Sequence, residues 1–276
     1  MVKVISPDFK DERNAMNHAA LQGRIALITG GGRGIGRAIA LGLARQGSSV
    51  AISARSQDEI DSAVKEIRLA GGIAVGIPGD LCTPGTARQL VALTLEAFGT
   101  VDILVNNAGI GSAPSPRSVA DFDDDFWNLS LALNLTAPYL LCKAVLPNML
   151  ERKKGRIINI SSIAGKIGLV HASAYSASKH GLLGFTKSLA LEVAKDGITV
   201  NAICPGPVRT AMSDARLAYD ARRMDMPVDE VEAKMTPIGR RLEPEEIVPL
   251  AILLAGDASA AITGQAFNVC GGVTMC

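Results

Sequence analysis

Short apolar runs alternate with longer segments of helical periodicity along most of this chain. Strands are expected at 24–28, 49–53, 72–78 and 101–106, with helices between them at 36–46, 58–70 and 86–98. Further strands are expected at 156–160, 198–203 and 265–269, with a helix at 174–194. Apolar strands that alternate with helices of this length are typical of a parallel sheet covered on both faces. The sequence therefore predicts an α/β fold, a doubly wound parallel sheet with helices on both faces.

The segment 209–240 interrupts this alternation. It is rich in charged residues and methionine and contains Pro227 and Pro237, so short helices and loops are expected there. It follows a strand end, and the ligand crevice of a parallel α/β sheet lies outside the carboxyl ends of its strands. We interpret 209–240 as a substrate lid, with a surface excursion as the alternative. We expect a loosely ordered arm at 1–20 and a single domain at 21–276, of which 209–240 is a part.

Composition argues against several classes of partner. The 276 residues carry a net charge of +1, which creates no strong field for nucleic acid or an anionic membrane. The five cysteines form no C-x-x-C pair, and the three histidines lack metal-ligand spacing. The first twenty residues contain no apolar core of signal-peptide length. We therefore expect a reduced, cytoplasmic protein with no metal site.

A glycine-rich turn joins the first strand to the first helix. It reads Thr29-Gly-Gly-Gly-Arg-Gly-Ile-Gly36, with the spacing Gly30-x-x-x-Gly34-x-Gly36. Glycines allow a tight turn and close approach to a pyrophosphate, and the following helix N-terminus offers free N–H groups. Because the turn lies between a strand and a helix, it indicates a dinucleotide site.

The end of the second strand indicates which dinucleotide. Enzymes of this architecture that use NAD hold a carboxylate there for the ribose 2′-hydroxyl, whereas an arginine accommodates a 2′-phosphate. This chain has Ser53-Ala-Arg55 and no acid before Asp58, and Arg33 lies inside the glycine turn. A guanidinium forms paired, charge-assisted bonds to phosphate. The sequence therefore predicts NADP(H).

Tyr175 and Lys179 lie four residues apart at the start of an expected helix, so they share one face. A free tyrosine has a pKa of about 10, and a base near neutral pH needs a pKa roughly three units lower. A neighbouring lysine cation, joined by an oxidised nicotinamide, acts in the required direction. Tyr175 is therefore a candidate acid or base.

These features recur with others in a fixed order. That order is Thr29-Gly30-x-x-x-Gly34-x-Gly36, Asp80, Asn106-Asn107-Ala108-Gly109, Asn134, Ser162, Tyr175-x-x-x-Lys179 and Pro205-Gly206. Over residues 22–272 the pattern resembles the short-chain dehydrogenase/reductase family. The resemblance implies a single-domain Rossmann-like fold, with a dinucleotide-binding catalytic domain at 21–276.

The resemblance also implies catalytic roles for Asn134, Ser162, Tyr175 and Lys179. Tyr175 would exchange a proton with the carbonyl or alcohol oxygen, and Ser162 would hydrogen-bond that oxygen. Lys179 would bind the nicotinamide ribose and lower the pKa of Tyr175. Asn134 would hold a water in a proton relay that runs through Lys179.

The implied cofactor contacts come from the glycine turn and from the ends of later strands. Asp80-Leu81 would contact the adenine, 107–109 would line the adenosine side and steady the sheet, and 205–210 would close over the nicotinamide amide. The full set is Gly30, Gly32, Arg33, Gly34, Ile35, Gly36, Arg55, Asp80, Leu81, Asn107, Ala108, Gly109, Tyr175, Lys179, Pro205, Gly206, Val208 and Thr210.

Within the family, 172–212 is similar to 3-oxoacyl and polyketide-type ketoreductases. This favours an NADP(H)-dependent oxidoreductase that reduces a ketone to a secondary alcohol. One alternative is an NAD(P)-dependent dehydrogenase of a small cyclic or aryl secondary alcohol or diol, in which His171 would touch the substrate. Another is a non-catalytic cofactor-sensing protein. The family resemblance also implies a homotetramer.

Overall fold

The computed structural model describes residues 20–276, which form one seven-stranded sheet in the order β3-β2-β1-β4-β5-β6-β7. The predicted arm at 1–20 lies, except for its last residue, outside the described residues. All neighbouring strands pair in parallel. The strands are β1 (Ile25–Thr29), β2 (Ser49–Ala54), β3 (Ala74–Pro78), β4 (Ile103–Asn106), β5 (Gly155–Ile160), β6 (Ile198–Pro205) and β7 (Ala266–Val269). The predicted doubly wound sheet is confirmed.

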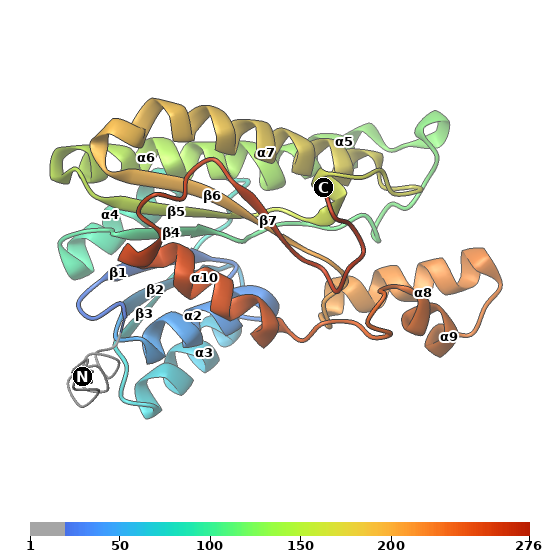
Figure 1. The fold of residues 1–276 in the computed structure, drawn as a ribbon, viewed down its shortest axis with the longest axis horizontal. Coiled ribbons are helices and arrows are strands. Elements are labelled where there is room, and N and C mark those ends of the chain that lie inside the picture. Colours follow the sequence, from blue (N-terminus) through green and yellow to red (C-terminus); the bar gives the residue numbers. More distant parts are fainter. Residues whose placement is uncertain (1–19) are drawn as a thin grey trace, which may run out of the picture.

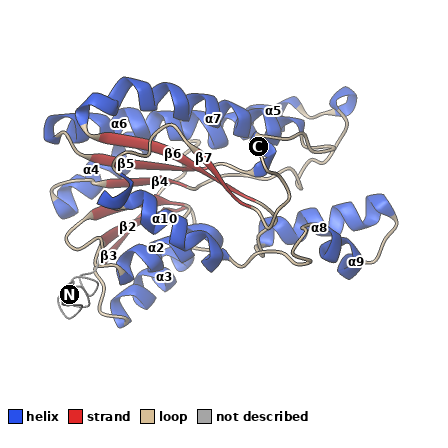
Figure 2. Ribbon diagram, viewed as in Figure 1, coloured by secondary structure: helices blue, strands red, loops and turns tan. Residues whose placement is uncertain are grey.

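Helices cover both faces of the sheet (Figures 1 and 2). Alternate residues of a strand point to opposite faces, and β1 shows this directly. Ala26 and Ile28 join one apolar core, whereas Leu27 joins a second core on the opposite face of the sheet. The helices are α2 (Gly34–Arg45), α3 (Gln57–Leu69), α4 (Thr86–Phe98), α5 (Asp124–Leu131), α6 (Ala137–Arg152), α7 (Ser173–Val193), α8 (Ala211–Met224), α9 (Val228–Lys234) and α10 (Val248–Ala255).

Between β4 and β5 the chain forms a long helix that the sequence analysis did not predict. It comprises α5, a π-helical turn at Ala132–Thr136, and α6. With a peak mean hydropathy of 1.5, it is long and apolar enough to cross a bilayer by length and composition alone. In this fold it packs on the sheet and against α4 and α7, as the core helix of a globular protein does.

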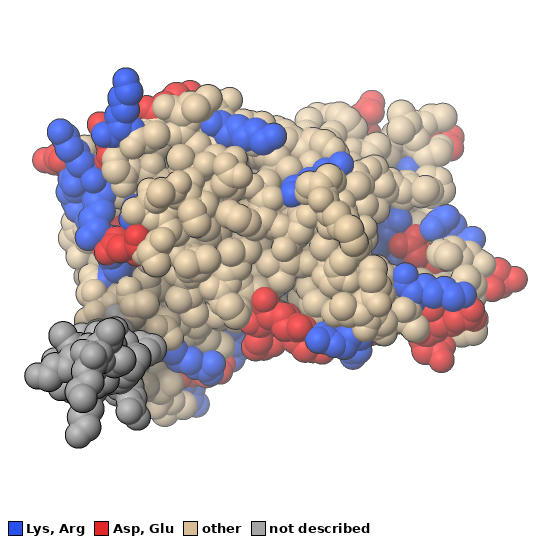
Figure 3. Space-filling view, viewed as in Figure 1, with Lys and Arg blue, Asp and Glu red and all other residues tan. Residues whose placement is uncertain are grey.

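The segment 209–240 forms α8 and α9, which project from the carboxyl ends of the strands (Figure 1). Its apolar residues form a small cluster of their own, centred on Leu217, Ala221 and Val231 and separate from both main cores. Figure 3 shows acidic and basic side chains side by side over this end of the molecule. The segment therefore has an apolar cluster of its own beneath a surface of mixed charge.

Candidate active site

Four side chains named from the sequence come from three separate elements. Ser162 follows β5, Tyr175 and Lys179 lie in the first turns of α7, and Asn134 lies in the π-helical turn between α5 and α6. Ser162 lies near enough to the Tyr175 phenol for its hydroxyl to lower the pKa of that phenol. The Lys179 ammonium lies 5.8 Å from the centre of the Tyr175 ring. The structure therefore brings the phenol, hydroxyl and ammonium groups together at one strand end.

Lys179 is held by the strand beside it. Its side chain is buried, and Nζ donates a 2.8 Å hydrogen bond to the backbone oxygen of Ile160 at the end of β5. Burial lowers the pKa of Lys179 to about 8, because a charged ammonium is poorly solvated there. The ammonium is thus fixed beside Tyr175 and titrates closer to neutrality than a free lysine.

The pKa of Tyr175 is raised in the protein without cofactor. Although the residue is only partly buried, burial of its phenol raises its pKa, and hydrogen bonding by Ser162 acts in the opposite direction. The expected decrease of about three units relies on Lys179 together with the positive charge of an oxidised nicotinamide, and it stays a prediction.

Asn134 is fully buried and its amide is fully used. Its Oδ1 accepts a bond from the Ile110 N–H, and its Nδ2 donates to the Ile110 oxygen and to Ser178 Oγ. Ser178 Oγ in turn donates to the Tyr175 backbone oxygen at 2.8 Å. The Asn134 side chain thus connects the loop after β4 with the first turn of α7. Ser178 was missed because a serine inside a helix carries no distinctive pattern.

The glycine turn forms the cradle that the sequence predicts. Gly30 and Gly34 have positive φ angles of 62° and 53°, which non-glycine residues adopt only with strain. A Cβ on Gly36 would lie 2.3 Å from the Gly30 oxygen, so no side chain fits there. Helix α2 begins at Gly34 with no side-chain cap and no acid in its first turn. Its free N–H groups fit a pyrophosphate.

Residues from later strands complete this cradle. Asn107 donates from Nδ2 to the Thr29 and Gly30 oxygens, and the Ala108 N–H donates to Thr29 Oγ1. Asn107 therefore locks the glycine turn to β4, in line with the predicted steadying role. A Cβ on Gly109 would lie 2.9 Å from Asn134 Oδ1, which places Gly109 beside the Asn134 side chain.

The remaining predicted cofactor residues lie at the same edge of the sheet. Asp80 and Leu81 follow β3, and Asp80 Oδ1 accepts a hydrogen bond from the Cys82 N–H. Ile35 packs its side chain against the core from the first turn of α2. Pro205 ends β6, and the Gly206 N–H donates to the Val269 oxygen.

Val208 and Thr210 connect this edge to the α8–α9 segment. Val208 is buried and pairs with Leu242 in an isolated bridge, while Thr210 caps α8 by accepting the Ser213 N–H. The Thr210 methyl lies 3.2 Å from the position of a Cβ on Gly34. The first turn of α2 and the first turn of α8 therefore meet, although they are far apart in the sequence.

The charges around Arg33 differ from the expectation of two cations and no acid. Arg33 is largely exposed, as is Arg55. However, Glu59 of α3 lies 3.7 Å from the Arg33 guanidinium, and a Cβ on Gly32 would lie 2.8 Å from Glu59 Cβ. Glu59 is not apparent from the sequence because it lies five residues beyond the end of β2. The first turn of α3 brings its side chain close to the glycine turn.

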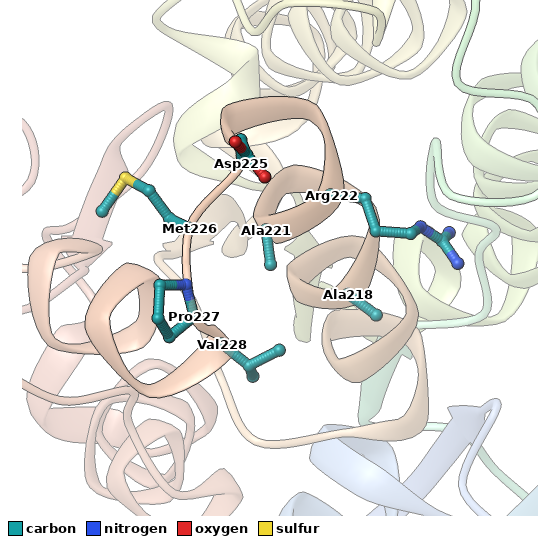
Figure 4. Close-up of a pocket in the computed structure, with 7 residues that line it drawn as sticks. All are labelled: Ala218, Ala221, Arg222, Asp225, Met226, Pro227 and Val228. Atoms are coloured by element: carbon teal, nitrogen blue, oxygen red, sulfur yellow. The ribbon is translucent and has the colours of Figure 1, made fainter.

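A hollow of about 520 Å³ lies away from these groups. Figure 4 shows its lining at the elbow between α8 and α9, with Arg222, Met226 and Val228 among its residues. No catalytic residue lines it, so it is not the place where Tyr175 meets a substrate. Among residues 20–276, no cluster of His, Cys, Asp or Glu could hold a metal ion.

Comparisons with known proteins agree with this geometry. Residues 24–220 match the family model for short chain dehydrogenases. A solved structure of a variant of actinorhodin polyketide ketoreductase with NADPH is 42% identical, with a TM-score of 0.86 over 91% of this chain and 97% of that chain.

Two curated relatives are similar over nearly their whole length. The 3-oxoacyl-[acyl-carrier-protein] reductase of Synechocystis is 40% identical over 93% of this chain and 99% of that protein. The D-beta-hydroxybutyrate dehydrogenase of Cupriavidus necator is 37% identical over 91% of this chain and 98% of that protein. The resemblance predicted from the motifs is confirmed, and the chain belongs to the short-chain dehydrogenase family of oxidoreductases.

Proposed function

We propose that this protein reduces a ketone to a secondary alcohol with NADP(H), and that its substrate is of the 3-oxoacyl type. The observation that carries the proposal is the meeting of Ser162, Tyr175 and Lys179 at the strand edge that also holds the glycine turn. The names of a polyketide ketoreductase and a 3-oxoacyl reductase among the similar proteins support the substrate class.

The cofactor supplies the hydride when it is bound, and the protein controls the proton. Tyr175 donates its phenolic proton to the carbonyl oxygen, and Ser162 hydrogen-bonds the same oxygen. Lys179 holds a positive charge near the phenolate that remains. Because burial opposes ionisation of Tyr175, positive charge from a bound oxidised nicotinamide adds to that of Lys179 in the alcohol-oxidising direction. Asn134 supports the relay through its main-chain carbonyl.

The choice of NADP(H) rests on the cationic groups at the adenosine end. Arg33 and Arg55 are exposed there, and a guanidinium suits a 2′-phosphate, although Arg33 is paired with Glu59. Two similar solved structures hold NADPH or NADP. Glu59 opposes this preference, because its carboxylate would repel a phosphate next to Arg33.

We also propose a homotetramer in the cytoplasm, without nucleic-acid or membrane partners. Three apolar side chains on α5 and α6, Leu129, Tyr139 and Leu140, remain exposed on the single chain. A second copy would cover this face. The net charge of +1 supports the absence of a polyanionic partner. The described cysteines, Cys82 to Cys276, are all free thiols, in keeping with a reducing compartment.

The division into one catalytic domain at 21–276 with a substrate lid at 209–240 is part of this proposal. The α8–α9 segment follows β6, starts beside the glycine turn, and has its own small core. These features suit a cover that moves as a unit over a substrate.

The test is to follow NADPH and NADH oxidation with β-ketoacyl thioesters, cyclic ketones and aryl ketones, with Tyr175→Phe as control. NADPH oxidation with a thioester, abolished in the variant, supports the proposal. Preference for NADH contradicts the cofactor assignment alone. Turnover confined to cyclic or aryl ketones favours the alcohol dehydrogenase alternative, and tight NADPH binding without any turnover favours the cofactor-sensing alternative.

A further inference from the structure

Arg216 of α8 connects three separate segments of the protein. Its guanidinium donates to Ser112 Oγ in the loop after β4 at 3.0 Å and to the Val170 oxygen in the loop before α7 at 2.8 Å. It also forms a two-point pair with Asp220, one turn further along α8, at 2.7 and 3.0 Å. We call this set, Arg216 with Ser112, Val170 and Asp220, the Arg216 bridge.

The two loops that the bridge reaches border the catalytic residues. Ser112 lies three residues after Gly109, whose position is beside Asn134, and Val170 lies five residues before Tyr175. Ser112 is buried, and the Arg216 side chain is only 16% exposed. The bridge therefore joins the α8–α9 segment to both loops, through a shielded contact at Ser112 and an exposed one at Val170.

A second contact reinforces the bridge. Tyr219 OH lies 2.5 Å from His171 Nδ1, and the Tyr219 ring lies under the Arg216 guanidinium at 5.3 Å. His171 has a φ of 54°, in the left-handed region that non-glycine residues rarely adopt. Such strain persists only where surrounding contacts hold it. The loop before α7 is therefore held against α8 by side-chain and backbone bonds.

The Arg216 charge is not free to bind an anion. Asp220 neutralises it directly, and the remaining N–H groups already have neutral acceptors. A carboxylate or phosphate of a substrate would have to displace Asp220. The geometry thus indicates a role in shaping the crevice rather than in binding a charged group.

We propose that the Arg216 bridge sets which ketones fit, by fixing the gap between α8 and the loops after β4 and before α7. The apolar cluster of the α8–α9 segment is separate from the main cores, so its distance from these two loops is set by the Arg216 bridge, the Tyr219–His171 contact and a few side-chain contacts. One is Met212, whose Cγ lies 2.8 Å from the position of a Cβ on Gly111. Arg216 is a positioning residue that limits the bulk beside the reacting carbonyl. This inference rests on the proposed function.

The test compares Arg216→Ala with Arg223→Ala. Arg223 lies on the same helix and pairs with the same Asp220, but it contacts neither loop. The readout is the ratio of kcat/KM for 3-oxododecanoyl against acetoacetyl N-acetylcysteamine thioesters. We expect Arg216→Ala to raise this ratio roughly tenfold, in the range by which a pocket discriminates on size. The Arg223→Ala ratio should stay near that of the wild type.

An unchanged ratio in Arg216→Ala, or an equal change in Arg223→Ala, overturns the proposal. Hydrogen exchange of 211–224 and 168–172, measured with NADPH bound, gives a readout independent of turnover. Faster exchange in Arg216→Ala alone supports the bridge, and unchanged exchange rejects it. If the wild type reduces none of the ketones, the proposed function fails, while exchange still decides whether Arg216 holds the segment in place.

Discussion

The two sides of the crevice are held by different forces. On the sheet side, Asn134, Ser178 and Lys179 are buried and joined by uncharged or backbone hydrogen bonds, over two large apolar cores. On the α8–α9 side, ion pairs and a small separate cluster provide most of the support. The difference indicates that the residues on the sheet side are rigidly held for catalysis. The α8–α9 segment, in contrast, can change its position and so affect which substrate binds. Substitutions on the sheet side should change kcat, and those on the other side should change KM.

The largest effect should come from Tyr175→Phe. It removes the proton donor but keeps the ring, so kcat/KM should fall by about 10²- to 10⁴-fold. The melting temperature should change little, because no partner of the hydroxyl other than Ser162 is lost. Steady-state kinetics and thermal unfolding measure both. If activity falls only in proportion to the loss of folded protein, Tyr175 stabilises the fold and does not act as the proton donor.

The dependence of kcat/KM on pH tests whether the charge of Lys179, on the sheet side, is needed for ketone reduction. Burial lowers the pKa of Lys179 to about 8, so its charge is present below this pH and is lost above it. Ketone reduction depends on that charge, and kcat/KM should fall roughly tenfold per pH unit above about 8. A profile that stays flat to pH 10 would show that the charge of Lys179 is not needed or is not lost.

Arg241→Ala tests the other wall. Arg241 is buried and pairs with Asp214 of α8 and Glu232 of α9. Removing one partner of a buried pair costs about 3–5 kcal/mol, and both acids keep some access to water here, so its loss should cost about 3 kcal/mol or less. We expect KM to rise severalfold while kcat stays within about twofold. Arg240→Ala is the matched control, because its pair with Glu246 is exposed. If kcat falls while KM does not rise, the α8–α9 side also contributes to the chemical step, and the assignment of kcat to one side and KM to the other is wrong.

The smallest effect should come from Glu59→Gln at the edge of the cofactor cradle. The Arg33–Glu59 pair is exposed and 3.7 Å long, so its charge interaction is weak and screened by salt. Removing the negative charge should tighten NADPH binding by about two- to fivefold at low salt, and leave NADH binding unchanged. Asp58→Asn, one residue earlier, is the control. Fluorescence titration of both cofactors measures the difference.

The sequence predicted the sheet side well because its signals are local. Strands β1, β2 and β5, the glycine turn, and the Tyr175–Lys179 spacing each depend on residues close together in the chain. The long helix that contains Asn134 was missed for a physical reason. Around α6 the residues are apolar on nearly every side, and Pro147 lies inside the helix, so neither periodicity nor helix-favouring composition marks it.

The recognition side could not be predicted because its contacts join distant residues. Ser112 and Val170 lie 104 and 46 positions from Arg216, and no local pattern relates them. The burial that raises the pKa of Tyr175 in the protein alone is likewise a property of the folded chain. Glu59 reaches Arg33 through the turn of α3. Each of these depends on how elements pack rather than on which elements form.

The approach of Thr210 to Gly34 ties two parts of the protein to one small space. Thr210 caps α8, and its methyl group lies 3.2 Å from the position of a Cβ on the glycine that begins α2. Any side chain at position 34 would therefore press on the start of α8 as well as on the glycine turn. The absence of a side chain at Gly34 thus serves the α8–α9 segment and the dinucleotide cradle together.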